Sequence, residues 1–410
     1  MGSLFEAFSH LLGEPDLLRK ETEGYVPGDI KAGSGEEGGG EESEGKPKLH
    51  YAVQLALYVD VLTRLGLSAG RSAFVWDIHG KEVPYNFTVP QGPNKPATLW
   101  DEYEGALAKA RSILNKQSRP LGAYSSTCKM CHWYTCCVDQ LSKADDLTLI
   151  PMLGRSKRDV MQATIATIAE LAEINPDGYI NGKKTIFDGI GPDTLRTFHE
   201  RAKLIKSDNP RPYLKSPVQL PSLERELFFD IEVDPMRDVC YLHGFVERRG
   251  GDNNSERFVA FFADDVTSAA EGRAFAQSWD FIKASQPAAV FYYSKYERTI
   301  YRKLQAKYPD VCSAEDIERF FDPTRSPTVD LYFDVVMPHT EWPTRDHSIK
   351  TLAKYLGFRW RDSNPSGAAS IEWFNQWTLV HDSSIRQRIL DYNEDDCRAT
   401  RVLLDGIRGF

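Results

Sequence analysis

The sequence predicts an α/β multidomain protein, and three observations support this fold class. The chain has 410 residues, more than a single hydrophobic core usually supports. Hydrophobic residues make up 41% of the composition and aromatic residues 11%, as in globular proteins. Short apolar runs that end at turn residues alternate with amphipathic stretches, which indicates strands that alternate with helices.

Composition also limits the compartment and the partners. No apolar run approaches the ~18 residues of a transmembrane helix. The first residues lack the basic region and the long apolar core of a secretory signal. We therefore expect a cytoplasmic protein with no membrane partner. The net charge of −9 argues against a general coat for nucleic acids, but it is compatible with a nuclease whose metal sites are acidic.

The central motif is an apolar run, residues 227–233, that ends at Pro235 and is typical of a buried strand. Its Asp230 and Glu232 point to the same side, because side chains alternate along a strand. Two adjacent carboxylates repel each other and lose hydration, and Mg²⁺ or Mn²⁺ offsets both costs. Taken alone, the motif fits a metal site and a solvated strand end equally well.

Two further acidic motifs follow in the chain. Residues 288–293 are a predicted strand, and Glu297 comes shortly after it. Residues 391–397 open a helical pattern in which Tyr392 and Asp396, at i and i+4, share one face. An acidic, solvated helix start is the alternative interpretation of the last motif, because acids favour helix N-termini.

Together these motifs resemble the DEDD exonucleases of the tyrosine subtype, which have an RNase H-like fold. In that family four carboxylates hold two metal ions, and the tyrosine orients the attacking water. The resemblance implies these catalytic and metal-binding residues: Asp230, Glu232, Glu297, Asp396 and Tyr392. Glu297 departs from the family pattern, which has an aspartate there. Residues 348–358 resemble the segment before the last motif, and Asp330 is expected to be structural. The implied domain is residues 222–410, with a mixed sheet.

The first part of the chain contains a different motif. Residues 15–18 and 25–31 are predicted strands joined by a polar turn, and Asp16 lies in the first of them. Asp29 and Lys31 share one face of the second strand. Two carboxylates bind a metal, and a neighbouring lysine stabilises charge on a phosphate under attack. An ordinary charged hairpin is the alternative.

A predicted helix, residues 50–62, places Gln54 and Tyr58 on one stripe at i and i+4. Combined with the strand motif, it resembles the RecB-like branch of the PD-(D/E)xK nucleases. The resemblance implies a restriction-endonuclease-like domain over residues 1–146. It implies Asp16 and Asp29 as metal ligands, with Lys31, Gln54 and Tyr58 also catalytic. Residues 33–48, rich in glycine and glutamate, are predicted to form an acidic mobile loop.

Four cysteines lie within ten residues: Cys128, Cys131, Cys136 and Cys137. This spacing is typical of metal ligands. In iron–sulfur nucleases of the RecB type, three such cysteines and one upstream cysteine hold a [4Fe–4S] cluster. The resemblance implies Cys128, Cys131 and Cys137, or Cys136 in place of Cys137, as cluster ligands. The upstream cysteine and helix of the family are missing, so we expect either a truncated N-terminus or an incomplete cluster. The alternative is a zinc site of Cys128, Cys131, His132 and one of Cys136 and Cys137.

Residues 147–221 are predicted to form a small helical domain, with helices at 160–173 and 196–205. The turn from Gly189 to Gly191 resembles a helix-hairpin-helix motif, in which backbone N–H groups contact a DNA phosphate. Residues 147–216 contain 11 Lys and Arg against 8 Asp and Glu, which favours contact with a phosphate backbone. A helical spacer between two catalytic domains is the alternative.

The order of these motifs resembles a bacterial family of two-nuclease proteins, RecB-like with a C-terminal RNase H-like domain. This resemblance implies a metal-dependent nuclease that acts on DNA in preference to RNA, on single strands or ends. Cleavage would be exonucleolytic and would follow two-metal chemistry. The alternative is a non-catalytic nucleic-acid-binding or scaffold protein with degenerate nuclease sites. Of the two sites, we expect the C-terminal one to carry most of the activity.

Overall fold

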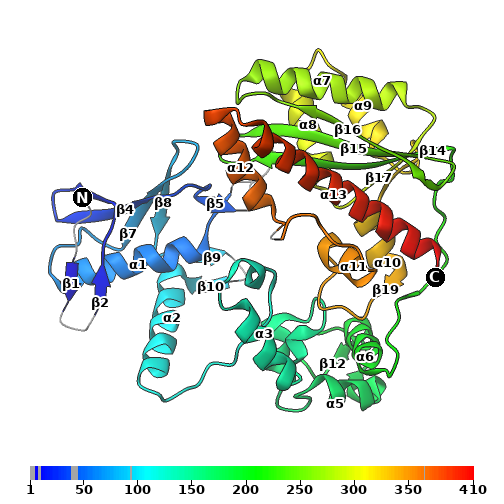
Figure 1. The fold of residues 1–410 in the computed structure, drawn as a ribbon. Coiled ribbons are helices and arrows are strands. Elements are labelled where there is room, and N and C mark those ends of the chain that lie inside the picture. Colours follow the sequence, from blue (N-terminus) through cyan, green and yellow to red (C-terminus); the bar gives the residue numbers. More distant parts are fainter. Residues whose placement is uncertain (1–4, 8–10, 38–44, 93–94, 364) are drawn as a thin grey trace. The chain divides into compact units, whose positions relative to one another are not determined.

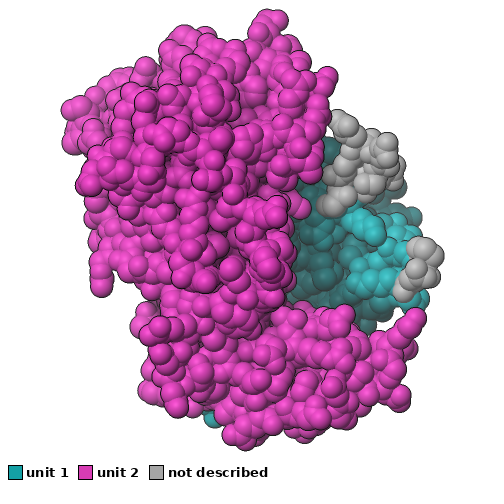
Figure 2. All heavy atoms as spheres, turned by 90° about the vertical axis from the view of Figure 1, so that its right-hand side faces the viewer, with its two compact units in different colours: residues 1–121 teal, residues 122–410 magenta. Residues whose placement is uncertain are grey.

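The computed structural model describes residues 5–7, 11–37, 45–92, 95–363 and 365–410 (Figure 1). The chain divides into two compact units, unit 1 with residues 1–121 and unit 2 with residues 122–410 (Figure 2). None of the described helices is both long and apolar enough to cross a membrane. Helices and mixed sheets occur in both units, so the predicted α/β class is confirmed.

Unit 1 is built on a four-stranded sheet with the order β3-β4-β7-β8. The strands are β3 (Leu17–Lys20), β4 (Tyr25–Ile30), β7 (Ser72–Trp76) and β8 (Glu82–Asn86). Strands β4 and β7 are parallel, whereas β3 and β8 pair antiparallel at the two edges. The first strand starts at Leu17 and not at Pro15, which has no N–H to donate to a ladder.

Helix α1 (Leu49–Arg64) makes the crossover between the two parallel strands. It buries Leu55 and Val59 against Val75 and Tyr85 of the sheet. Helix α2 (Leu99–Leu114) packs on α1 and begins at a capping box of Thr98 and Asp101. The remaining strands form short hairpins: β1 (Phe5–Ala7), β2 (Leu11–Gly13), β5 (Glu36–Glu37), β6 (Lys46–Pro47), β9 (Pro90–Gly92) and β10 (Lys95–Thr98). The middle of the predicted acidic loop, residues 38–44, lies outside the described residues.

Unit 2 begins with a helical segment, residues 122–206, that has its own apolar core. Its helices are α3 (Tyr134–Lys143), α4 (Gly154–Met161), α5 (Ile168–Glu173) and α6 (Pro192–Lys206). The prediction of one helix over residues 160–173 is wrong. Helix α4 ends at Met161, and Thr167 starts a new helix because it forms a capping box with Glu170. A hairpin of β11 (Ile180–Asn181) and β12 (Lys184–Thr185) lies between α5 and α6.

The rest of unit 2 is organised around a five-stranded sheet with the order β16-β15-β14-β17-β18 (Figure 1). The strands are β14 (Arg225–Asp234), β15 (Val239–Arg249), β16 (Asp252–Phe262), β17 (Ala289–Tyr292) and β18 (Thr328–Asp330). The first three strands are antiparallel, and β17 and β18 continue the sheet in parallel with β14. The turn before β16 consists of Gly250 and Gly251, both with positive φ.

Helices cover both faces of this sheet (Figure 1). Helices α7 (Ser268–Ala284), α8 (Tyr296–Lys307) and α9 (Ala314–Phe320) share a core with Phe229 of β14. Helix α13 (Ser383–Arg408) crosses the other face, where Cys397 and Leu403 pack with Phe228. This helix starts at Ser383, eight residues before the predicted start at Asp391. The alternative of a solvated helix start is therefore wrong.

The connections of unit 2 contain the remaining elements: β13 (Tyr213–Leu214), α10 (Met337–His339), β19 (Thr340–Glu341), α11 (Ile349–Tyr355) and α12 (Gly367–Val380). Strand β13 lies in the proline-containing stretch 207–221 and pairs with β19. Arg201 of α6 forms two hydrogen bonds of 2.9 Å to the Glu341 carboxylate, and both side chains are buried. These contacts join the helical segment to the sheet part of unit 2.

Candidate functional site

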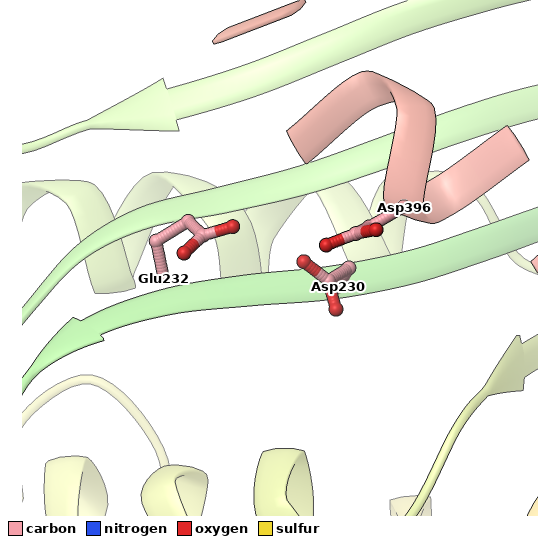
Figure 3. Close-up of side chains that lie close together, drawn as sticks. All are labelled: Asp230, Glu232 and Asp396. Atoms are coloured by element: carbon pink, nitrogen blue, oxygen red, sulfur yellow. The ribbon is translucent and has the colours of Figure 1, made fainter. Parts of the chain in front are cut away.

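Three carboxylates converge where α13 crosses the central strand β14 (Figure 3). Asp230 and Glu232 project from β14, and Asp396 reaches them from α13. One oxygen of each residue lies within 4.8 Å of the other two. Among the residues that the structure describes, no other three acidic, histidine or cysteine side chains meet this distance. We call these three residues the acid group.

The acid group is strongly desolvated, which sets its proton affinity. Burial raises the pKa of all three carboxyls above the ordinary range, and that of Glu232 to about 8. The negative charge of Asp396 adds to this rise at Asp230 and Glu232. A divalent cation with hard oxygen ligands can replace the shared protons and neutralise the group. The donor set therefore fits Mg²⁺ or Mn²⁺.

Glu297 lies beside the acid group but outside it. The residue occupies the first turn of α8 and is 3% exposed. Its Oε2 atom is buried and has no hydrogen-bond partner among the described residues. Burial raises its pKa well above the ordinary value, and the negative charge of Asp396 adds to this rise. An unpaired buried carboxylate oxygen next to three others is a position at which a cation would be favourable.

Tyr392 lies next to the acid group, as its spacing from Asp396 predicts. Its hydroxyl accepts a hydrogen bond of 2.7 Å from Lys350 Nζ of α11. The same Nζ atom is 3.9 Å from Asp396 Oδ2. Burial raises the pKa of Tyr392 above its ordinary value, so the hydroxyl stays protonated. Lys350 falls within the predicted segment 348–358, although its role was not predicted.

Two further residues orient the acid group without having been predicted. Asn393 Nδ2 donates to Asp230 Oδ2 at 2.7 Å, and Trp360 Nε1 donates to Asp396 Oδ1 at 2.7 Å. Asn393 reaches β14 through a gap at Gly244, which is the register partner of Asp230. A Cβ atom at Gly244 would lie 1.6 Å from Asn393 Oδ1. The sequence signal for Asn393 was its place beside Tyr392 on a helix face with apolar neighbours.

The strand end at Asp330 has the structural role that was expected. Its Oδ1 atom accepts hydrogen bonds from the backbone N–H groups of Ser294, Tyr332 and Phe333. A π-helical turn, Leu331–Val336, follows directly. Asp330 therefore fixes the end of β17, from which the chain enters α8 and Glu297.

Unit 1 brings together all five residues predicted for the N-terminal site. Lys31 forms an ion pair with Asp29 and donates from Nζ to Gln54 Oε1 at 2.8 Å. Gln54 Nε2 in turn donates to the Tyr58 hydroxyl at 2.7 Å. Asp16 Oδ2 accepts from the backbone N–H of Ile30 at 2.9 Å, and the Asp16 and Asp29 side chains share a hydrogen bond.

The two carboxyls of this N-terminal site differ in proton affinity. The hydrogen bond from Asp29 lowers the pKa of Asp16, whereas burial raises the pKa of Asp29. The ion pair with Lys31 supplies a fixed positive charge next to Asp29. Asp16 and Asp29 are a pair of oxygen ligands suited to one Mg²⁺ or Mn²⁺, beside a lysine that can face a phosphate.

The cysteine segment packs with unit 2. Cys128 lies in a 3-10 turn, Ser126–Met130, whereas Cys136 and Cys137 lie in the first turn of α3. Adjacent helical residues diverge by about 100°, so these two thiols do not point the same way. The described thiols do not form a set of three ligands within 4.8 Å, with or without His132. Binding of a [4Fe–4S] cluster or of zinc would require the segment to draw these thiols closer together.

Comparison with known protein families gives two matches. Residues 227–407 match the model of the RNase H superfamily, and residues 4–138 match that of the PD-(D/E)XK nuclease superfamily. Among curated proteins and among solved structures, none matches this chain. The predicted layout of a PD-(D/E)XK nuclease domain followed by an RNase H-like domain is thereby confirmed. The RecB-like branch and the DEDD subtype stay predictions. The iron–sulfur cluster, the helix-hairpin-helix motif and the exact domain limits stay predictions.

Proposed function

We propose that this chain, which joins a PD-(D/E)XK nuclease superfamily domain to an RNase H superfamily domain, hydrolyses DNA from ends or along single strands. Both superfamilies indicate a metal-dependent nuclease. The exonucleolytic mode, the preference for DNA over RNA and the use of two metal ions belong to the proposal. The observation that supports it most is the buried acid group of Asp230, Glu232 and Asp396.

Each residue of the C-terminal site has a role that follows from its contacts. Asp230, Glu232 and Asp396 would hold Mg²⁺ or Mn²⁺, and Glu297 would complete a second ion position. Asn393 and Trp360 fix the carboxylates that they contact. Bound ions would activate the attacking water and stabilise the leaving oxygen.

We assign to Tyr392 the role of orienting the attacking water. The tyrosine oxygen accepts a hydrogen bond from Lys350, and its O–H shares a hydrogen bond with Asp396, from which it would turn to the water once a cation occupies that carboxylate. Lys350 also brings positive charge to within 3.9 Å of Asp396, where a phosphate under attack would carry negative charge. Neither role requires Tyr392 to ionise, which agrees with its raised pKa.

A non-catalytic nucleic-acid-binding protein is the second candidate. The observation that favours it is the position of Glu297 outside the acid group, where the family pattern has a shorter aspartate. The same N-terminal and C-terminal residues would then bind nucleic acid without cleaving it.

The deciding experiment measures nucleotide release from end-labelled single-stranded DNA with Mn²⁺ and with EDTA. We expect release with Mn²⁺ alone, and a loss of at least ~10²-fold in Asp396→Asn. Asp391→Asn is the matched control, since Asp391 lies on the same helix but pairs with Arg361 outside the acid group. Intact DNA with the wild-type protein would favour the non-catalytic candidate. Full activity of Asp396→Asn would overturn the assignment of the acid group.

A further inference from the structure

A cavity of about 810 Å³ lies within unit 2, between the helical segment and the sheet part. Its wall includes the start of α4, the residues that follow β17, and residues 345–348 before α11. Its size is within the range of pockets that enclose a small ligand. We call it the basic cavity, after the cations that line it: Arg155, Lys157 and Arg345.

These three cations have no carboxylate partner among the described residues. Lys157 Nζ donates to the Met152 carbonyl oxygen at 3.0 Å, and Arg345 donates to Ser142 Oγ at 3.3 Å. A fourth lining cation, Lys129, is neutralised by Asp346 at 2.9 Å. Unpaired positive charge concentrated in one cavity of a protein with net charge −9 favours an anionic ligand.

Uncharged groups of the wall also point to a ligand with aromatic and polar parts. His347 is 6% exposed, and its Nε2 atom is buried without a hydrogen-bond partner among the described residues. A buried ring nitrogen of this kind is normally satisfied, and a bound molecule can do so. Tyr293 and Tyr332 are half-buried, with ring centroids 5.4 Å apart. Such rings offer faces or edges to unpaired bases.

Two short segments of the chain connect the wall of the basic cavity to residues beside the acid group. Ser294 lines the cavity, and Glu297 follows it three residues later. Ser348 lines the cavity, and Lys350, which contacts Tyr392, follows two residues later. A strand whose phosphodiester lies at the acid group can therefore continue into the cavity.

We propose that the basic cavity binds the part of a single-stranded nucleic acid adjacent to the phosphodiester that is cleaved at the acid group. Arg155, Lys157 and Arg345 contact phosphates, and Tyr293 and Tyr332 contact bases. Recognition of this kind is independent of base sequence. The inference rests on the proposed function for the identity of the neighbouring site, but binding in the cavity does not require cleavage.

The test measures binding of a labelled oligothymidylate by fluorescence anisotropy in EDTA, at several salt concentrations. The full-length variant Arg155→Gln/Lys157→Gln is expected to raise Kd about 10–100-fold at low salt. Its slope of log K against log salt should be smaller by about 1.4, because two phosphate contacts are lost and each contributes about 0.7 on a single strand. Tyr332→Leu should raise Kd about tenfold at all salt concentrations, because stacking is less sensitive to salt than phosphate contacts.

Lys183→Gln/Lys184→Gln is the matched control, since both lysines are exposed cations of the helical segment outside the cavity wall. Equal losses of affinity in the two double variants would overturn the proposal, because they would show that general charge attraction explains the binding. Unchanged binding by the cavity variant would also overturn it. Oligouridylate is tested in the same way. The cavity variant is expected to lose affinity for whichever of the two oligonucleotides the wild type binds more tightly.

The outcome also separates this inference from the proposed function. Cavity-dependent binding by a protein that releases no nucleotide with Mn²⁺ would support the cavity and reject the nuclease. Cleavage by a protein whose cavity variant binds normally would support the nuclease and reject the cavity. Thermal unfolding of each variant, compared with the wild type, confirms that the fold is retained.

Discussion

The two candidate sites solve the same electrostatic problem in different ways. In unit 1, Lys31 pairs directly with Asp29, so a positive charge belongs permanently to the site. In unit 2, Lys350 is the cation that pairs with the acid group among the described residues, 3.9 Å from Asp396, and burial raises the pKa of the three carboxyls. A site in which three buried carboxyls face one distant cation depends more strongly on an external cation. We therefore expect the C-terminal site to respond more to metal than the N-terminal site.

The largest expected difference concerns cleavage itself. Asp230→Ala should reduce release from single-stranded DNA by at least ~10³-fold, because it removes one of three converging ligands. Lys31→Ala on the same substrate should reduce it by less than about tenfold. Initial rates with saturating Mn²⁺ provide the comparison. If Lys31→Ala removes nearly all cleavage and Asp230→Ala leaves it unchanged, the ranking of the two sites is reversed.

The next largest effect is on the stability of the metal-free protein. A carboxyl whose pKa is raised on folding binds more protons in the native than in the unfolded state. The free energy of unfolding must therefore fall as pH rises from the unfolded-state pKa, about 4.5, to about 8, the pKa of Glu232. We expect a fall of a few kcal/mol in unit 2.

Urea titrations in EDTA between pH 5 and pH 8.5 measure this loss. Mn²⁺ should reverse it, because the ion takes the place of the protons. Glu232→Gln should flatten the profile without metal. A stability that rises over this range in EDTA would contradict the account of the acid group as a set of protonated, buried carboxyls.

A smaller effect is expected for the residue that orients Asp230. Asn393→Ala removes one hydrogen bond to a carboxylate, worth about 1.5–3 kcal/mol, so kcat should fall about tenfold or somewhat more. Asn375→Ala on α12 is the control for loss of a partly buried amide. Steady-state kinetics that show a raised KM with an unchanged kcat would place Asn393 in substrate binding instead.

The smallest effect on cleavage is expected at the cysteines. We predict that protein purified without oxygen carries iron and sulfide bound through Cys128, Cys131 and Cys137. Cys131→Ser should remove the metal while changing cleavage at the acid group less than about threefold, since none of the thiols belongs to that group. Metal analysis with an absorption spectrum measures this. Stoichiometric zinc without iron would decide for the zinc alternative.

The sequence predicts the strand motifs better than the helical ones. The alternation along β14 correctly places Asp230 and Glu232 together, because a strand has only two faces. Residues 391–396 contain four acids, and the sequence singles out Asp396 only through its spacing from Tyr392 and the family resemblance, since helix geometry alone favours none of them. Arg361 forms ion pairs with Asp391, Glu394 and Asp395, so only Asp396 remains for the acid group. That choice depends on the rotation of α13, which distant packing sets.

Contacts that close over long sequence separations could not be predicted at all. The absence of a side chain at Gly244 leaves room for the Asn393 side chain, and Asn393 lies 149 positions later in the chain. Trp360 belongs to no recognisable sequence motif, yet its indole N–H donates a hydrogen bond that fixes Asp396. The break between α4 and α5 has a local cause, the capping box of Thr167 and Glu170. The apolar pattern over residues 160–173 does not reveal it, but these two residues do.

The buried pair of Arg201 and Glu341 has a consequence for the cleavage that we propose. Because this pair fastens the helical segment to the sheet part, it holds the walls of the basic cavity at a fixed separation. Under the two proposals, a strand shortened stepwise would at some point no longer reach from the acid group into the cavity, and it would then lose its phosphate contacts and dissociate. Digestion should in that case end at short oligonucleotides of one characteristic length.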